Sequence, residues 1–589
     1  MRSVLIILLF LVACVNQAQA QSVKPAIAES EFLRLVNEGK EVTQSTVKAD
    51  LIIKALSLGK GVTVKECLIE GDLLFRNKEA LHLNIIDTVV NGKVGFDGTT
   101  FKGQLTFSGR TTLNDEVIFD NVTFNDLFTI DGEVVFNKWF QAYNCKFSEQ
   151  VRFDNVSFKN GASFNESTFN KLANFIATKT WGRGMYCERA TFLGPTELND
   201  MVFYGDAEFS DTKFKGDADF SYTVFRGEEV NFRDAEFSGT AVFSHTKFQG
   251  TVNFAHVKFL GDAHFNQINS DSGPINSTKS GDAPLRGRLL LASTSFHGRA
   301  YFDDSLLYSV NLSNHWGKER NRNPTIFEKR LIARNLICKV CDFTEVEFRD
   351  YVDFSNAWFT EMVVFSGASF RGEVNFYSAR FPPLTSANDK LNGGISFDKV
   401  RFENAVHLEY SQLRETSPWW RVWSNPKTKV SNHDTTTWGS LEHVFKNSGS
   451  TESQNEAFFN KRSLAPYSAG PDRENRATNF FSKYFWGYGV RPWRVFFWIV
   501  FLFGVFTAIY FSQTKPMGSI TERLRFALNF AWRTSVTLGY GLQQSRTTLF
   551  KTLTLIHSVV FKIMLLCLLK AVANVSPLLN DLIGKLLPV

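Results

Sequence analysis

Two short stretches of this sequence hold residues whose types and spacing could do chemistry. The first is Cys338 and Cys341, a CxxC pair, which is a spacing that can hold a metal ion or a redox disulfide. The pair is isolated, and Cys341 falls on a small-residue position of the repeat described below, so a structural role is the stronger interpretation. The sequence has no nucleophile elbow, HExxH pair or phosphate-binding loop, and its carboxylates fall on outward repeat positions. We therefore expect no enzyme, no metal site and no cofactor.

The second stretch is TLGYG, residues 537–541, between two apolar segments near the C-terminus. Two glycines around one tyrosine allow the backbone to leave helical geometry. Non-helical backbone at membrane depth is tolerated where it is buried in protein or lines a water-filled path. The role of this stretch therefore depends on the elements that position it.

Composition limits the class of protein. With 589 residues the chain is too long for one ordinary core, so several units or a repeat array are expected. The net charge of +6 is small for this length and no basic block stands out, so no nucleic-acid partner is expected. The 59 phenylalanines indicate one structural position that is filled again and again.

A repeat accounts for these phenylalanines. In residues 207–265 successive phenylalanines lie five or six positions apart, with a single interval of seven, and a small or β-branched residue lies two positions before each. A helix repeats every 3.6 residues and a strand every 2, so this spacing requires a chain that turns a corner about every five residues. Each side then points a large and a small residue inward, and coils must stack because none can bury its apolar side alone. The phenylalanines are Phe209, Phe214, Phe220, Phe225, Phe232, Phe237, Phe243, Phe248, Phe254, Phe259 and Phe265.

This pattern resembles the pentapeptide-repeat family, in the variant with phenylalanine at the centre of each repeat. The resemblance implies an all-β, right-handed, quadrilateral β-helix with one pentapeptide on each side. We place this solenoid at residues 96–413, after an N-terminal region with irregular first coils at residues 21–95. The sixth residue of the longer repeats is often glycine, which we expect at corners with positive φ.

The sequence also predicts two interruptions of the repeat and a connector after it. Residues 268–287 are rich in Ser, Gly and Asn and are expected to be a surface loop, and residues 313–336 are expected to be an insertion that could hold a short helix. Residues 414–485 predict a helical connector, with a hairpin over 437–463 that could cap the open end of the solenoid or couple the solenoid to the membrane part. Gly449 is the expected stop between the helices, and Ser453 with Glu456 has capping-box spacing.

The N-terminus predicts export. Arg2, an apolar run and Ala18-Gln19-Ala20 indicate a signal peptide at residues 1–20. The sequence LVAC also resembles a bacterial lipobox with Cys14 as the lipidated residue, and an uncleaved anchor is a third interpretation. All three place the following segment outside the cytoplasm, so the solenoid is expected to be extracytoplasmic at a bacterial inner membrane.

Residues 486–589 predict an α-helical membrane domain in contact with lipid. Its expected spans are 493–512, which is uncharged from Val495 to Phe511, and 549–572, which is less uniform because it contains His557 and three lysines. Between them, residues 524–542 predict a short helix that runs into a re-entrant loop.

This arrangement resembles the two-helix pore module of the potassium-channel family, and the whole tail resembles bacterial proteins that join pentapeptide repeats to such a pore. The resemblance implies a homotetramer with potassium as the permeant ion, and carbonyl oxygens of the filter replace the hydration shell of the ion. The implied selectivity filter is Thr537, Leu538, Gly539, Tyr540 and Gly541, and Thr534 lies in the implied pore helix.

The sequence departs from that family in three ways. Leu542 stands where the family usually has Asp, and Arg533 and Lys562 would repel a cation. A filter of this family enters the membrane from outside, whereas the export signal places the residues before the first span outside. An inverted pore, a misread N-terminus and a module that no longer conducts all remain open. Two functions are therefore expected: potassium conduction, or a non-conducting envelope scaffold whose solenoid binds a protein partner.

Overall fold

The computed structural model describes residues 24–270, 287–313, 323–382, 394–414, 435–467, 475–514, 518–537, 539–544 and 547–576. The predicted signal peptide, Cys14 and most of the expected loop at 268–287 lie outside these residues. The chain divides into two compact units. The first comprises residues up to Ile395 together with Arg401–Asn404, and the second comprises Ser396–Val400 and the chain from Ala405 onward.

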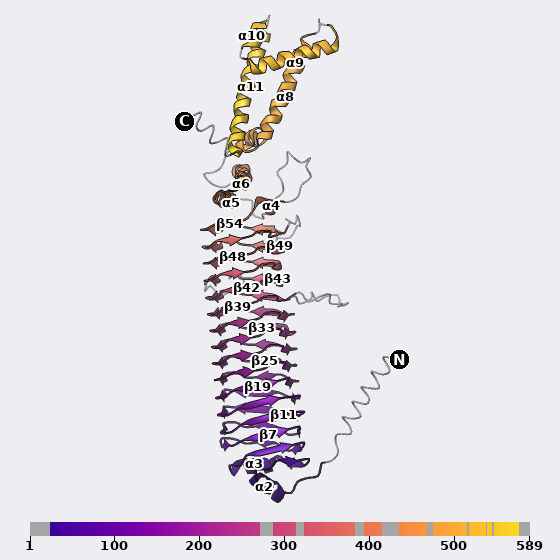
Figure 1. Cartoon of the computed structure of the whole chain (residues 1–589), viewed down its shortest axis with the longest axis vertical. Helices are drawn as coiled ribbons and strands as arrows, with labels where there is room; N and C mark the ends of the chain where they lie inside the picture. Colours follow the sequence, from indigo (N-terminus) through magenta and orange to yellow (C-terminus); the bar gives the residue numbers. More distant parts are fainter. Residues whose placement is uncertain are drawn as a thin grey trace, which may run out of the picture. The chain divides into compact units, whose positions relative to one another are not determined.

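The first unit is a four-sided solenoid of short parallel strands (Figure 1). Each strand pairs with the equivalent strands one coil before and one coil after it, as Phe214 pairs with Phe192 and Phe237. This confirms the predicted parallel β-solenoid. The four ladders begin at β1 (Val42–Thr43), β6 (Glu79–Ala80), β2 (Thr46–Lys48) and β5 (Leu73–Leu74). They end at β54 (Val406–His407), β53 (Arg401–Phe402), β36 (Lys247–Phe248) and β52 (Gly394–Ser396), respectively. Two helices, α2 (Glu29–Asn37) and α3 (Ala49–Ser57), accompany the first coils.

Columns of stacked phenylalanine rings fill the interior of the solenoid. In the longest column, ring centroids are 4.5–5.4 Å apart and the ring planes differ by only 3–13°. Parallel pairing in register forces this stacking, because each phenylalanine lies directly above its equivalent in the previous coil. The column consists of Phe101, Phe124, Phe147, Phe169, Phe192, Phe214, Phe237, Phe259, Phe296, Phe327, Phe348, Phe370 and Phe402.

At many small inward positions the neighbouring coil supplies an acceptor for a buried hydroxyl group, although the Thr196 hydroxyl has no partner among the described residues. Thr212 donates to the carbonyl of Cys187 at 2.6 Å, and Thr223 donates to that of Leu198 at 2.7 Å. Both threonines are fully buried. A buried hydroxyl without such a partner would cost free energy of folding, so these bonds explain why Thr alternates with Ala and Val in the repeat.

Many of the glycines at the corners serve a purpose other than the one predicted. In the regular coils Gly261 and its equivalents do not have positive φ. Instead, a Cβ atom on Gly261 would lie 2.3 Å from the carbonyl oxygen of Gly239 in the coil before. The left-handed conformation falls mostly on non-glycine residues such as Asp211 and His245, with φ of 55° and 61°, although Gly132 and Gly161 have positive φ as predicted. The glycines are therefore required for close approach between coils.

Part of the predicted insertion at 313–336 belongs to the solenoid instead. Residues 314–322 lie outside the described residues, but β44 (Ile326–Phe327) and β45 (Leu331–Ile332) are strands of the regular ladders. Thr325 and Phe327 have the spacing of the repeat, and the Thr325 hydroxyl donates to the carbonyl of Leu291 at 2.7 Å. The described part of this segment contains no helix, because the repeat spacing persists through it.

The second unit begins with the predicted helical hairpin, formed by α5 (Thr435–Asn447) and α6 (Thr451–Leu464). Gly449, with φ of 72°, ends the first helix as expected. The predicted capping box is wrong, because Ser450 is the N-cap residue and Ser453 lies inside the first turn of α6. The hairpin turns so tightly after Gly449 that the second helix begins earlier than the spacing of Ser453 and Glu456 predicted.

Replacing one ring of the column tests how much the stack contributes to stability. Phe259→Ala should lower the free energy of unfolding by about 3–5 kcal/mol, because it leaves a cavity between Phe237 and Phe296. The matched control is Lys258→Ala in the same strand, whose exposed side chain should contribute less than about 0.5 kcal/mol. Denaturant unfolding followed by circular dichroism measures both, and equal effects would contradict the stacking account.

Candidate functional site

The second unit ends in a module of four helices, which holds the residues singled out near the C-terminus. They are α8 (Pro492–Ser512), α9 (Ile520–Val536), α10 (Tyr540–Gln544) and α11 (Thr548–Val575). Figure 1 shows α9 lying across the direction of α8 and α11. Proline in the first turn starts α8, a capping box formed by Ser519 and Glu522 starts α9, and Thr547 caps α11 by accepting from the backbone NH of Phe550.

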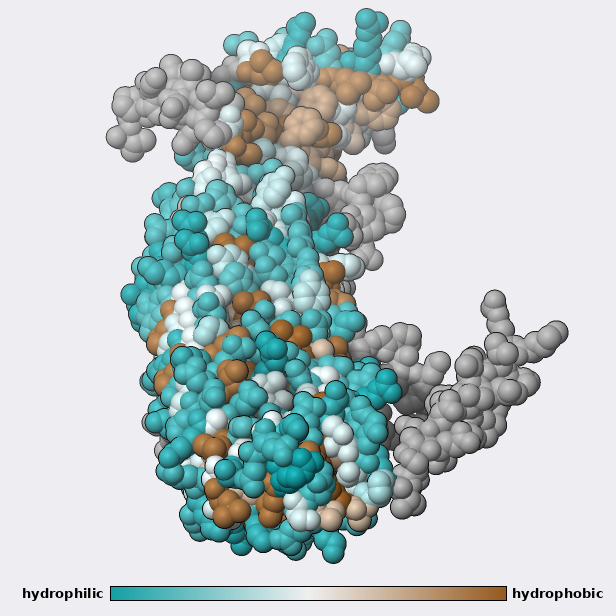
Figure 2. Space-filling view, turned by 60° about the horizontal axis from the view of Figure 1, so that its bottom comes forward, coloured by the Kyte–Doolittle hydropathy of each residue, from teal (hydrophilic) through white to brown (hydrophobic). Residues whose placement is uncertain are grey.

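Two of these helices, α8 and α11, are long and apolar enough to cross a membrane, with mean hydropathies of 2.2 and 2.1. At about 1.5 Å per residue each spans a hydrocarbon core of about 30 Å. Only 22% of each apolar window is buried within the protein, whereas a core helix of a soluble protein would be mostly buried. Figure 2 shows the apolar surface gathered on the C-terminal helices, which indicates a membrane protein.

A buried histidine on α11 connects the three longer helices of the module. The hydroxyl of Tyr510 on α8 lies 2.9 Å from His557 Nδ1, and the Oγ of Ser535 on α9 lies 3.1 Å from Nε2. Ser535 donates its own proton to the carbonyl of Ala531 at 2.8 Å. Its oxygen must therefore accept from Nε2–H, and Tyr510 then donates to Nδ1. The neutral ring with its proton on Nε2 satisfies every group.

Apolar packing surrounds this hydrogen-bond network. The ring of Phe506 stacks on His557 with centroids 4.1 Å apart, and Tyr510 meets Phe530 edge-on at 4.9 Å. His557 is fully buried and Tyr510 is 1% exposed. Hydrogen bonds of polar side chains between helices hold helices together at membrane depth, because the alternative is an unsatisfied polar group in hydrocarbon. The network therefore fixes α9 against both α8 and α11.

The predicted filter residues follow directly after α9. Thr537 caps the helix in an extended conformation, Gly539 has φ of 83°, and Tyr540 and Gly541 lie in α10. The carbonyl of Gly539 accepts from the backbone NH groups of Leu542 and Gln543, at 3.1 and 3.2 Å. Leu538 lies outside the described residues. A filter requires four chains around one ion, so its assignment stays a prediction.

Two further residues of the predicted pore region have defined surroundings. Thr534, the predicted pore-helix residue, is fully buried, and its hydroxyl has no hydrogen-bond partner among the described residues. The Arg533 guanidinium donates to the Tyr540 hydroxyl at 3.4 Å and lies 5.6 Å from the centre of that ring. A permanent positive charge therefore lies against a residue of the predicted filter.

Sequence reasoning identified His557 only as a costly polar residue in the second span. A histidine in an apolar helix is the signal that could have marked the network, because such a side chain needs partners. Tyr510 and Ser535 carried no comparable signal, since neither is unusual in its own segment and their convergence depends on how the helices cross.

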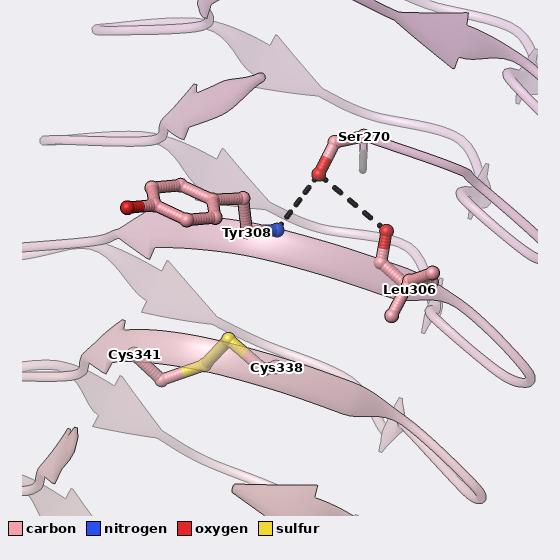
Figure 3. The surroundings of a disulfide bond; sticks show 5 residues. All are labelled: Ser270, Leu306, Tyr308, Cys338 and Cys341. Carbon is pink, nitrogen blue, oxygen red and sulfur yellow. Dashed lines mark hydrogen bonds between the residues drawn. A yellow bond between two sulfur atoms is a disulfide. The ribbon is translucent and has the colours of Figure 1, made fainter. Parts of the chain in front are cut away.

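The CxxC pair forms a disulfide inside the solenoid. Cys338 and Cys341 lie in β46 (Ile337–Asp342), one coil after β43 (Leu306–Asn311), and both are fully buried (Figure 3). Cys341 pairs with Val310 and Val363, which confirms that it occupies a small-residue position. Among the described residues no group of three or more His, Cys, Asp and Glu side chains could hold a metal ion.

Comparisons with known proteins support the repeat part of this description. Residues 188–235 and 220–269 match the family model described as pentapeptide repeats, nine copies. No curated protein and no solved structure matches the chain. The fold and these repeats define the class: a pentapeptide-repeat β-solenoid followed by helices, two of which can span a membrane. The matched part lies wholly within the solenoid.

Replacing the central histidine should loosen the module. His557→Phe keeps an aromatic ring beside Phe506 but leaves the buried Tyr510 hydroxyl without a partner, so we expect a loss of about 1–3 kcal/mol. Thermal unfolding of the detergent-solubilised protein measures this loss. Lys551→Gln, an exposed change on the same helix, is the control. Equal midpoints for both variants would mean that the network does not stabilise the module.

The unpaired cysteines should differ in reactivity. Burial raises the pKa of the Cys145 thiol to about 12 and also raises the pKa values of Cys67 and Cys187, so these thiols stay protonated at neutral pH. In the folded protein at pH 8, iodoacetamide should modify Cys567 and leave these three intact until denaturant is added. Peptide mass spectrometry measures the modification, and rapid labelling of Cys145 would show that the solenoid opens.

Proposed function

We propose that the chain is a membrane-anchored pentapeptide-repeat protein whose C-terminal module assembles as a homotetramer and conducts cations, with potassium as the expected ion. The observation that carries the proposal is a short helix, α9, fixed against two candidate spans by the His557 network and followed at once by the TLGYG stretch. The carboxyl end of a helix carries partial negative charge, so the end of α9 favours a cation beside residues 537–541.

Exposed apolar side chains on the module support assembly. Trp532 and Val536 on α9 are 61% and 60% exposed in the single chain, and Leu566 on α11 is 66% exposed. Such a surface requires lipid or further copies of the chain. Packing four modules around one axis would cover α9, which carries charged residues and is therefore a poor span by itself.

A second candidate function is favoured by the conformation of the loop. The carbonyl of Gly539 is occupied by α10, and Arg533 lies against Tyr540. Conduction therefore requires that α10 unwinds on assembly and that Arg533 moves away. If neither occurs, the two spans only anchor the solenoid, which would act as an envelope scaffold and bind a protein partner. Neither role involves catalysis by this chain.

The buried disulfide supports an extracytoplasmic solenoid, since disulfides persist in oxidising compartments. Topology reporters fused after residues 430, 520 and 589 test this placement. We expect residue 430 to be outside the cytoplasm and residue 520 to be inside it. That result would place the loop entry on the cytoplasmic side, opposite to the orientation usual for potassium channels, whereas a cytoplasmic 430 would reject the export signal.

Ion flux into liposomes tests conduction. The purified full-length protein should pass potassium, and Gly539→Ala should lower the flux at least about tenfold, because an alanine is strained at φ of 83°. Gly504→Ala in α8 is the matched control, since a Cβ there meets no atom within 4 Å and its φ is not positive. Absence of flux from reconstituted tetramers of the unmodified chain would favour the scaffold function.

A further inference from the structure

Three cations gather where the chain enters the first candidate span. They are Lys483 in η2 (Ser482–Trp486), Arg491, and Arg494 in the first turn of α8. Arg491 pairs with Glu456 of α6 at 2.7 Å, whereas neither Lys483 nor Arg494 has an ion-pair partner in the part of the chain that the structure describes. Three cations and one carboxylate leave two positive charges, so this junction lacks counter-charge.

The guanidinium groups of the junction are only partly satisfied. Arg494 is 1% exposed and donates to the carbonyl of Lys483. Among the described residues, the buried Nε atoms of Arg491 and Arg494 have no hydrogen-bond partner. Burial, and then repulsion from Arg494, lowers the pKa of Lys483. An anion beside Lys483 and Arg491 would reverse this repulsion.

An apolar groove of about 500 Å³ begins at the same helical turn. One wall consists of Phe481, Phe485 and Trp486, and the other is α11, through Ile563 and Cys567 among others. Phe481 is 58% exposed and Ile563 is 53% exposed. The groove is therefore open and lined almost entirely by apolar and aromatic side chains.

Aromatic residues of the kind that gather at the level of lipid headgroups surround this junction. Trp486 and Trp493 flank the cations, and the indole of Trp498 donates to the carbonyl of Tyr484 at 3.4 Å. Tryptophan and tyrosine gather at the boundary between hydrocarbon and water. The apolar groove fits the acyl chain of a lipid, and cations without counter-charge at the same level fit an anionic headgroup.

We propose that the groove and the junction cations bind one anionic phospholipid. An acyl chain lies along Phe485 and Ile563, and the phosphate lies between Lys483 and Arg491. Because Arg491 also pairs with Glu456, the bound lipid would tie α6 to the start of α8. The proposal is independent of conduction, since an anchored scaffold would hold the lipid equally well.

Cys567 lines the groove and is a native reporter of its occupancy. Delipidated full-length protein in detergent is labelled with a fluorescent maleimide, with phosphatidylglycerol or phosphatidylcholine added to the micelles. We expect phosphatidylglycerol to slow labelling of Cys567 at least about fivefold and phosphatidylcholine to slow it less than about twofold. Native mass spectrometry should show one phosphatidylglycerol molecule retained per chain.

Matched variants distinguish the contribution of the Lys483 charge to lipid binding from that of the shape of the groove. Lys483→Gln should reduce protection to the phosphatidylcholine level, Lys483→Arg should retain it, and Lys551→Gln near the start of α11 should have no effect. Ser482→Trp should fill the groove and abolish the lipid adduct while Lys483 is still present. If Lys483→Gln does not fold, Lys483→Arg still tests the charge requirement. A folded Lys483→Arg variant that loses the lipid adduct would contradict the proposal that the positive charge is what binds the lipid.

Three results would overturn the proposal. Equal protection of Cys567 by phosphatidylglycerol and phosphatidylcholine would mean that the groove binds acyl chains without recognising an anionic headgroup. Protection by inorganic phosphate alone would mean an anion site without a lipid. Disulfide-linked dimers through Cys567, together with protection that increases with protein concentration in the absence of lipid, would mean that a second copy of the chain occupies the groove.

Discussion

Each coil of the solenoid depends on its neighbours for two things at once, backbone hydrogen bonds and cover for its apolar side. Parallel pairing in register supplies both, because it brings each NH group opposite a carbonyl of the next coil and each phenylalanine over its equivalent. The close corners follow from the same constraint: Gly261 has room only for a hydrogen atom where it meets Gly239. Buried threonine hydroxyls likewise use carbonyls of an adjacent coil. The sequence repeats regularly because every coil must meet this same requirement.

The C-terminal module follows a different rule. Its long helices satisfy their own backbone groups, so they can carry apolar side chains all round, and what remains to be fixed is how the helices meet. A few polar contacts do this. His557 joins α8, α9 and α11, and Asn574 near the end of α11 donates to the carbonyl of Gly489 just before α8. Gly487, Tyr488 and Gly489 all have positive φ, which turns the chain sharply between η2 and the first span.

The surfaces of the two units reflect these two rules. The solenoid buries most of its apolar side chains in its interior, and its surface is mostly polar with scattered apolar patches (Figure 2). The module leaves apolar residues of α8, α9 and α11 exposed, and an open groove lies between η2 and α11. Under the proposed function, lipid, further copies of the chain, or both cover these surfaces. The module thus differs from the solenoid in that many of its apolar side chains are not buried within the single chain.

The amino-acid sequence alone determined the solenoid, because a residue pattern that recurs every five or six positions has one way to bury its phenylalanines. It also determined the two candidate spans and the helical hairpin, through apolar length and the stop at Gly449. The corners were predicted only in part: Gly161 has the expected positive φ, but the pattern does not show that the carbonyl of Gly239 lies beside Gly261. Residues 323–336 were misjudged because charged residues obscured the repeat there. Only the tertiary structure decided that His557 meets Tyr510 and Ser535, and that the carbonyl of Gly539 is engaged by α10. It also decided that neither Lys483 nor Arg494 has an ion-pair partner within the described ranges. These relations depend on how helices cross in space, and residues far apart in the chain carry no local signal of meeting.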